Sequence, residues 1–129
     1  MLAIDTNIRV RIAVADDREQ ALRARELVET QTVRVSATVL LEAEWVLRSL
    51  YRRKPDEIVR TLRSFIDLPN VVAENRDAAR RALSWAKAGM DFADALPLSG
   101  AIDAEAFISF DRDLAKQAAR LGAPEVRAP

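Results

Sequence analysis

The sequence predicts an α/β fold: a three-layer sandwich in which a mostly parallel sheet of four or five strands has helices on both faces. Two observations support this prediction. Short apolar runs alternate along the chain with longer segments of helical periodicity, and 129 residues are enough for a single core. Alternating strands and helices favour parallel pairing, because each helix returns the chain to the same end of the sheet. We therefore expect one domain over residues 1–129.

The expected strands are short. Residues 1–4 form an apolar run that ends at Asp5, and we expect a buried strand there. The next three strands are expected at residues 33–36, 71–73 and 106–110, and residues 125–127 are expected to add a short edge strand.

The expected helices begin at residues that favour helix starts and end near glycine or proline. They run over 17–30 with Asp16 or Asp17 as cap, from Ser36 or Thr38 to about Tyr51, from Pro55 to Pro69, from Asn75 to Gly89, from about 92 to 101, and over 112–121. Apolar residues at helical spacing give these helices a buried side. The helix from Pro55 is the clearest case, with Ile58, Val59, Leu62, Phe65 and Ile66.

The composition excludes several kinds of chemistry. The chain has no cysteine and no histidine, which excludes a disulfide framework, a histidine base and the usual zinc ligands. Hydrolysis would have to rely on carboxylates, which are hard ligands suited to Mg²⁺ or Mn²⁺. No apolar run approaches the roughly 20 residues that span a bilayer, and the start of the chain does not resemble a signal peptide. We therefore expect a cytoplasmic protein.

Four acidic residues are the candidate catalytic and metal-binding residues: Asp5, Glu42, Asp94 and Asp111. Asp5 and Asp111 directly follow the first and fourth expected strands, and ligands of open parallel sheets bind at the carboxyl ends of strands. If those two strands are neighbours, the four acids converge at one edge of the sheet. Clustered carboxylates repel one another unless a divalent cation neutralises them, and such an ion also activates water for hydrolysis.

Each acid also has a purely structural interpretation. Asp91 and Asp111 are suited to cap helices, since aspartate favours helix starts. Glu42 lies at the margin of its helix's apolar side, whose centre is expected to run through Val39, Ala43, Val46 and Leu50. Glu44 falls further from that centre, so Glu42 is the preferred candidate for a half-buried ligand.

The basic residues give a weaker signal. The net charge is zero, so no overall positive field attracts nucleic acid. Arg9 and Arg11 follow Asp5, and Arg48 and Arg52 lie near the end of the helix that carries Glu42, so these four are candidates for RNA phosphate contacts. The alternative for the second pair is that cations complement the dipole of the helix end. Trp45 and Trp85 are expected to pack rather than to stack on bases.

Four segments occur in a suggestive order: Leu2-Ala3-Ile4-Asp5-Thr6-Asn7, Leu41-Glu42-Ala43-Glu44, Asp91-Phe92-Ala93-Asp94-Ala95-Leu96 and Phe107-Ile108-Ser109-Phe110-Asp111-Arg112-Asp113. Together they resemble the PIN-domain family, and especially the VapC toxins of toxin–antitoxin pairs. The resemblance implies the strand order 3-2-1-4-5, which makes the first and fourth strands neighbours. It also implies a Mg²⁺- or Mn²⁺-dependent endoribonuclease, a cognate VapB-type antitoxin and a homodimer.

Carried over by position, the resemblance makes Asp5, Glu42, Asp94 and Asp111 the metal-binding acids. Asn7 and Ser109 match polar residues that orient the acids, and Asp91 and Asp113 match auxiliary acids. One departure is Pro97, where similar sequences often have histidine; we expect a kink, or a helix start shifted towards it.

Two alternatives stay open. The chain could use this fold only to bind an antitoxin, without activity. It could also be a Mg²⁺-dependent receiver or phosphatase-like module, although those folds need an Asp-x-Asp pair or a nearby lysine. Here Thr6 and Asn7 follow Asp5, and no lysine lies near the expected site.

Overall fold

Seven helices and five short strands make up the computed structural model, which describes all of residues 1–129. They group into two units, Met1–Arg76 and Asp77–Pro129. The expected α/β fold class is confirmed, since every strand pair is parallel and helices connect the strands. None of the helices is long and apolar enough to cross a membrane.

The first unit contains a three-stranded parallel sheet in the order β1-β2-β3. The strands are β1 (Leu2–Ala3), β2 (Val33–Val35) and β3 (Val71–Ala73), with Leu2 opposite Val33 and Val33 opposite Val71. Val33 and Val35 of β2 and Val71 of β3 are fully buried. The three strands lie where the sequence predicts them.

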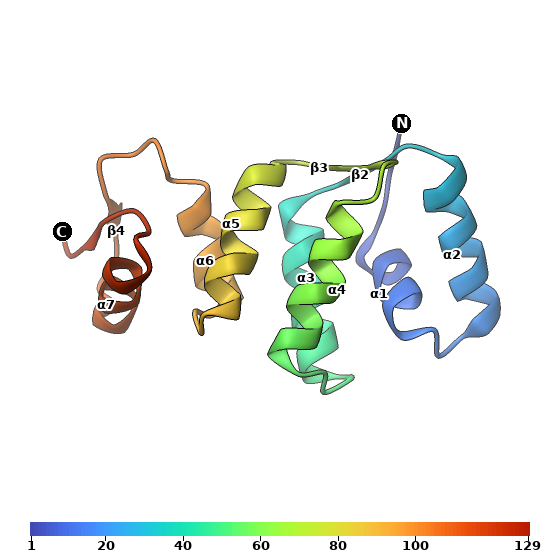
Figure 1. The fold of residues 1–129 in the computed structure, drawn as a ribbon, viewed down its shortest axis with the longest axis horizontal. Coiled ribbons are helices and arrows are strands. Elements are labelled where there is room, and N and C mark those ends of the chain that lie inside the picture. Colours follow the sequence, from blue (N-terminus) through green and yellow to red (C-terminus); the bar gives the residue numbers. More distant parts are fainter. The chain divides into compact units, whose positions relative to one another are not determined.

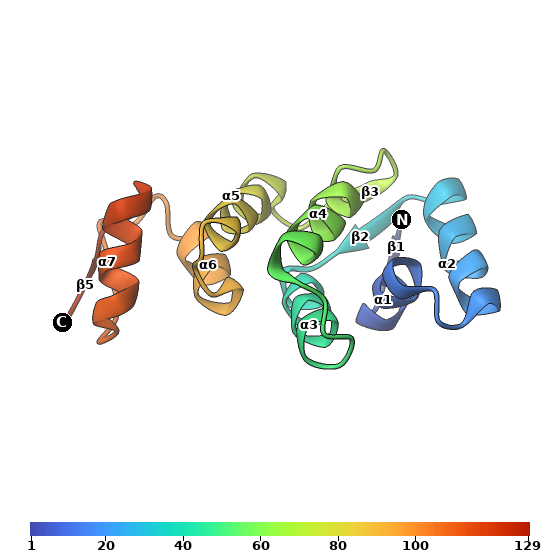
Figure 2. The ribbon, with the colours of Figure 1, turned by 60° about the horizontal axis from the view of Figure 1, so that its bottom comes forward.

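Four helices belong to the same unit: α1 (Thr6–Val14), α2 (Arg18–Thr30), α3 (Ala37–Ser49) and α4 (Pro55–Ile66). Helix α1 packs against α2 and α3, and α3 and α4 run side by side in opposite directions (Figures 1 and 2). All five apolar residues expected on the inner side of α4 are buried. Asp17 caps α2 and Ser36 caps α3, as two of the predicted starts require.

Two expectations for the first unit are wrong. Residues 1–4 were expected to form a buried strand, but Leu2 is 48 % exposed and only Ile4 of this segment is buried. Helix α1 was not expected at all. Its Ile8, Val10 and Ile12 alternate with Arg9 and Arg11, and this period of two is not the signature of a helix.

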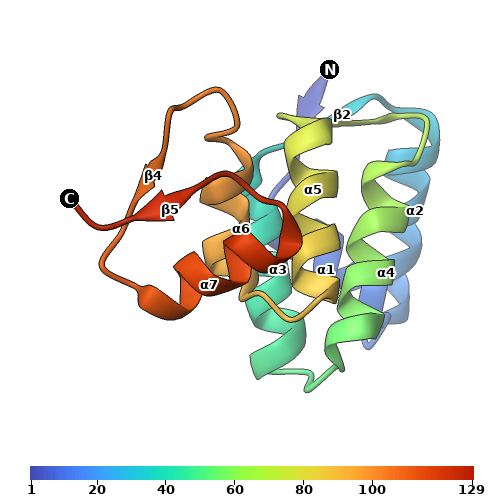
Figure 3. The same cartoon turned by 60° about the vertical axis from the view of Figure 1, so that its left-hand side comes forward.

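The second unit contains α5 (Arg76–Lys87) from its second residue onward and α6 (Phe92–Ser99), and these two helices lie side by side (Figures 1 and 3). Strands β4 (Phe107–Ile108) and β5 (Val126–Arg127) then pair in parallel and are joined by α7 (Arg112–Leu121), which packs against β5. Helix α7 ends at Gly122, whose positive φ of 69° favours glycine. Helix α6 starts at Phe92 and includes Pro97, so the helix start is not shifted towards the proline.

The strand order 3-2-1-4-5 combines two parts that the structure contains separately. Strands β1, β2 and β3 are ordered 3-2-1 within the first unit, and β4 pairs with β5 in the second. A neighbouring position of β1 and β4 would join the two units, and it stays a prediction. The same holds for the expectation of one domain.

Candidate active site

In the first unit, Asp5 and Glu42 are linked through Thr6. Asp5 Oδ1 accepts a hydrogen bond of 2.7 Å from the backbone N–H of Thr6, and Thr6 Oγ1 donates one of 2.8 Å to Glu42 Oε2. Both carboxylates are exposed, whereas Thr6 is only 8 % exposed. Two of the four candidate acids are thus brought together by a residue that was not among the candidates. No local pattern identifies Thr6, because its partner Glu42 is 36 positions away.

The local sequence explains where these two acids lie. The N–H of Ile4 donates to Arg34 O (3.2 Å), which holds the end of β1 against β2. Asp5 follows in an extended conformation and caps α1. On the neighbouring strand, Ser36 Oγ accepts from the N–H of Val39 (3.2 Å) and so starts α3, which puts Glu42 in the second turn of that helix.

Glu42 is not the half-buried residue that the sequence predicts. The buried side of α3 consists of Leu40, Ala43, Glu44 and Leu47, about one position round from the expected centre. Glu44 is 9 % exposed and is compensated by Arg48, whose Nε donates to Glu44 Oε1 at 2.8 Å. A buried charge with such a partner is tolerated, so the polar character of Glu44 misleads a pattern that counts only apolar residues.

In the second unit, two other candidate acids, Asp91 and Asp111, affect the pKa of Asp94. Burial raises the pKa of Asp94 above its ordinary value, and the negative charges of Asp91 and Asp111 raise it further. Asp94 is half-buried in the first turn of α6, while Asp91 and Asp111 are exposed. The charges at the start of α6 and at the start of α7 therefore both disfavour the ionised form of Asp94.

The structural interpretation of Asp91 and Asp111 is confirmed, because both residues cap helices. Asp91 Oδ1 accepts from the N–H of Ala93 and Asp111 Oδ1 accepts from the N–H of Leu114, each at 3.0 Å. A cap uses one carboxylate oxygen, and a carboxylate has two. Capping and metal binding are therefore compatible at the same side chain.

The other polar candidates have smaller parts. Ser109 Oγ accepts the backbone N–H of Asp111 at 3.0 Å, so it acts on the backbone of Asp111 and not on the carboxylate. Asp113 is exposed in the first turn of α7, and Asn7 is exposed near the start of α1.

The donor set fits a hard divalent cation. All four candidate ligands are carboxylates, and a cation would offset the repulsion that Asp94 experiences from Asp91 and Asp111. Neither unit by itself brings three or more acidic side chains close enough to hold one ion.

Arg9 is not available to RNA, and the expectation for it is wrong. It is 2 % exposed, its Nη2 donates to Thr61 O at 2.7 Å, and its guanidinium carbon lies 4.4 Å from the centre of the Phe65 ring. Burial lowers the pKa of Arg9 to about 10. The side chain holds α1 against α4 instead of facing solvent.

The remaining candidate arginines differ in how far they are engaged. Arg11 donates to Asp16 (2.7 Å) and to Gln20 (2.8 Å), and Arg48 is paired with Glu44. Arg52 is exposed in the turn after α3, where its φ is 51°. Of the four, Arg52 is the one placed most openly for a phosphate contact.

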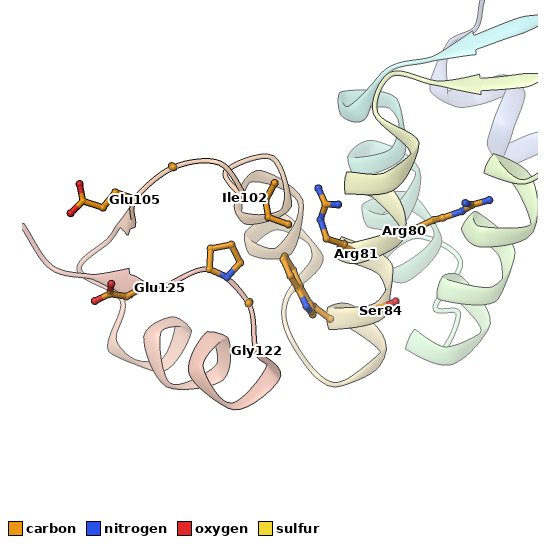
Figure 4. Close-up of a pocket in the computed structure, with 11 residues that line it drawn as sticks. Arg80, Arg81, Ser84, Ile102, Glu105, Gly122 and Glu125 are labelled. Carbon is orange, nitrogen blue, oxygen red and sulfur yellow. The ribbon is translucent and has the colours of Figure 1, made fainter.

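A pocket of about 600 Å³ in the second unit has none of the candidate acids in its lining (Figure 4). Arg81 and Trp85 of α5, Ile102 and the segment 122–125 before β5 are among the residues that line it. Arg80 points away from Glu105 and Glu125 in the same view. The half-buried Trp85 thus lines a pocket that none of the candidate acids lines. Trp45 of α3 is 52 % exposed, against the expectation that it packs.

Comparison with known proteins identifies the family. A search of curated proteins gives no match to this chain. The sequence pattern of the family described as PIN domain matches residues 2–120. The match covers most of both units and includes all four candidate acids. The chain therefore belongs to the PIN domain family.

Proposed function

We propose that this protein is a divalent-metal-dependent endoribonuclease and the toxin of a toxin–antitoxin pair. PIN domains are generally metal-dependent nucleases. Within that family, the proposal assigns Asp5, Glu42, Asp94 and Asp111 as the metal-binding and catalytic acids, with Asp91 and Asp113 as auxiliary acids.

The observation that carries the proposal is the grouping of the acids into two pairs. Asp5 and Glu42 share Thr6 as a hydrogen-bond partner, and the charge of Asp111 contributes to the raised pKa of Asp94. Asp5 follows β1 and Asp111 comes shortly after β4. Ligands of open parallel sheets bind at the carboxyl ends of the strands, which is where these two acids occur in the chain.

The proposed chemistry needs little from the protein besides the carboxylates. When bound, Mg²⁺ or Mn²⁺ supplies the positive charge that activates water and stabilises the leaving oxygen of a phosphodiester. The caps at Asp5 and Asp111 hold these side chains at fixed positions before any ion arrives. With no histidine in the chain, a carboxylate site is the arrangement that these residue types allow.

The partners follow from the proposed function. RNA is the substrate, and Arg52 is the basic residue best placed to contact its phosphates. Arg11 and Arg48 are available only if their ion pairs open. A VapB-type antitoxin would hold the toxin in check in the cytoplasm, and the toxin would be a homodimer.

The proposal is tested by incubating the purified protein with a mixed RNA pool in Mg²⁺, in Mn²⁺ and with a chelator. We expect cleavage with either ion and none with the chelator. Asp5→Asn and Asp94→Asn should each lower the rate at least 100-fold, because each removes a charge that the ion requires. Asp103→Asn is the matched control, since Asp103 is an exposed acid between α6 and β4 that is not a candidate ligand.

Two results would count against the proposal. Equal cleavage in chelator, or full activity of Asp5→Asn, would exclude the metal mechanism. No cleavage of any RNA, together with tight binding of an antitoxin peptide, would favour the inactive binding protein instead.

A further inference from the structure

Thr6 forms hydrogen bonds with both candidate acids of the first unit, Asp5 and Glu42. Its backbone N–H donates to Asp5 Oδ1 at 2.7 Å, and its hydroxyl donates to Glu42 Oε2 at 2.8 Å. The two acids come from different elements, the cap of α1 and the second turn of α3. Thr6 therefore joins them across the packing of α1 against α3.

The surroundings of the two partners differ. Thr6 is 8 % exposed and thus held in place by its neighbours, while Glu42 is exposed. A glutamate has three side-chain torsions and loses much freedom when it is fixed at a ligand. The Thr6 hydroxyl fixes one oxygen of Glu42 in advance and leaves Oε1 for another partner. Hydrogen bonds of this kind to ligating carboxylates orient them towards the metal.

We propose that Thr6 is a positioning residue that sets the relative orientation of Asp5 and Glu42 for divalent-metal binding. This inference rests on the proposed function, because it assigns Thr6 a part in the same site. It differs from the roles expected for Asn7 and Ser109, since Thr6 is the residue whose side chain holds a candidate carboxylate directly.

A purely structural role for the hydroxyl would have a different signature. Thr6→Val keeps the branched shape and removes only the hydroxyl. Glu42 is exposed, so water can replace the lost donor, and we expect little change in the melting temperature. If the hydroxyl served only to hold α1 against α3, the melting temperature would fall and metal affinity would stay the same.

The experiment measures Mn²⁺ affinity by calorimetry on the full chain without RNA, and RNA cleavage separately. We expect Thr6→Val to weaken Mn²⁺ binding by about 10–100-fold, as loss of a hydrogen bond to a ligand typically does. Thr6→Ser, which keeps the hydroxyl, should restore most of that affinity. Cleavage by Thr6→Val should recover when Mn²⁺ is raised, with the KM for RNA unchanged.

The matched control is Thr30→Val, because the Thr30 hydroxyl donates to Glu26 O within its own helix and touches neither acid. Wild-type Mn²⁺ affinity in folded Thr6→Val, or failure of Thr6→Ser to restore affinity, would overturn the inference while leaving the proposed function intact. Absence of Mn²⁺ binding and of cleavage in the wild-type protein would overturn both.

Discussion

At the scale of single residues, the surroundings of Asp94 disfavour its charged form. Burial raises its pKa, and the charges of Asp91 and Asp111 raise it further. A carboxyl group whose pKa is higher in the folded than in the unfolded state destabilises the fold when it ionises. This cost is present above the pKa of folded Asp94 and disappears as the pH falls through it.

Asp94→Asn should therefore stabilise the metal-free protein at neutral pH while removing its activity. The gain should be below about 1 kcal/mol, because solvent screens the half-buried Asp94. Denaturant unfolding in chelator at neutral and at acidic pH measures the effect. The difference from wild type should shrink in acid, and a loss of stability at neutral pH would contradict the prediction.

Arg9 gives a second test at this scale, because its buried charge lies against the Phe65 ring and the backbone oxygen of Thr61. Its pKa of about 10 leaves it charged at neutral pH. Arg9→Met fills most of the space without a charge, so we expect stability within about 1 kcal/mol of wild type. Arg9→Ala should cost about 2–4 kcal/mol, since it leaves a cavity beside Phe65. Equal losses in both variants, measured by denaturant unfolding, would show that the charge itself is needed.

At the scale of elements, the sequence predicts six of the seven helices and the positions of all five strands. Residues with a local signal carry this success, such as the Asp17, Ser36 and Asp111 caps and Gly122 after α7. The failures lie where a charged residue is buried. Arg9 in α1 and Glu44 in α3 are both buried. Arg9 donates to Thr61 O, which is far away in the sequence, and Glu44 accepts from Arg48, which is not apolar. A pattern that counts only apolar residues does not identify buried charged residues such as these.

Helix α7 allows the structural and the proposed catalytic parts of Asp111 to be separated. Asp111→Asn keeps an oxygen that can accept from the N–H of Leu114, whereas Asp111→Ala removes the cap. We expect Asp111→Ala to lose about 1 kcal/mol in the free energy of unfolding and Asp111→Asn to lose much less.

Both Asp111 variants should lose nuclease activity to a similar extent, because both remove the carboxylate charge. Thermal unfolding and RNA cleavage, measured on the same preparations, compare the two effects. If activity followed stability instead, with Asp111→Asn active, the role of Asp111 would be limited to capping α7.

At the scale of the whole molecule, the sequence identifies the candidate acids more readily than the residues that contact them. Aspartates that follow a strand or start a helix have a local signature, and Asp5, Asp91 and Asp111 all do so. Thr6 has none, since its role depends on a hydroxyl meeting Glu42 across two helices. That contact depends on how α1 packs on α3, and α1 itself was not predicted from the sequence.

The proposed metal binding predicts a change in the stability of the protein. An ion that binds the folded protein and not the unfolded chain stabilises the fold, so Mg²⁺ should raise the unfolding temperature. At about 100 times its dissociation constant, an ion adds roughly 2.7 kcal/mol. Calorimetric scans with Mg²⁺ and with chelator should show this shift in the wild type and in Asp103→Asn, but not in Asp5→Asn or Asp94→Asn. If Asp94→Asn kept the shift in full, Asp94 would not be a ligand of the ion, and the assignment of the four acids as ligands would be wrong.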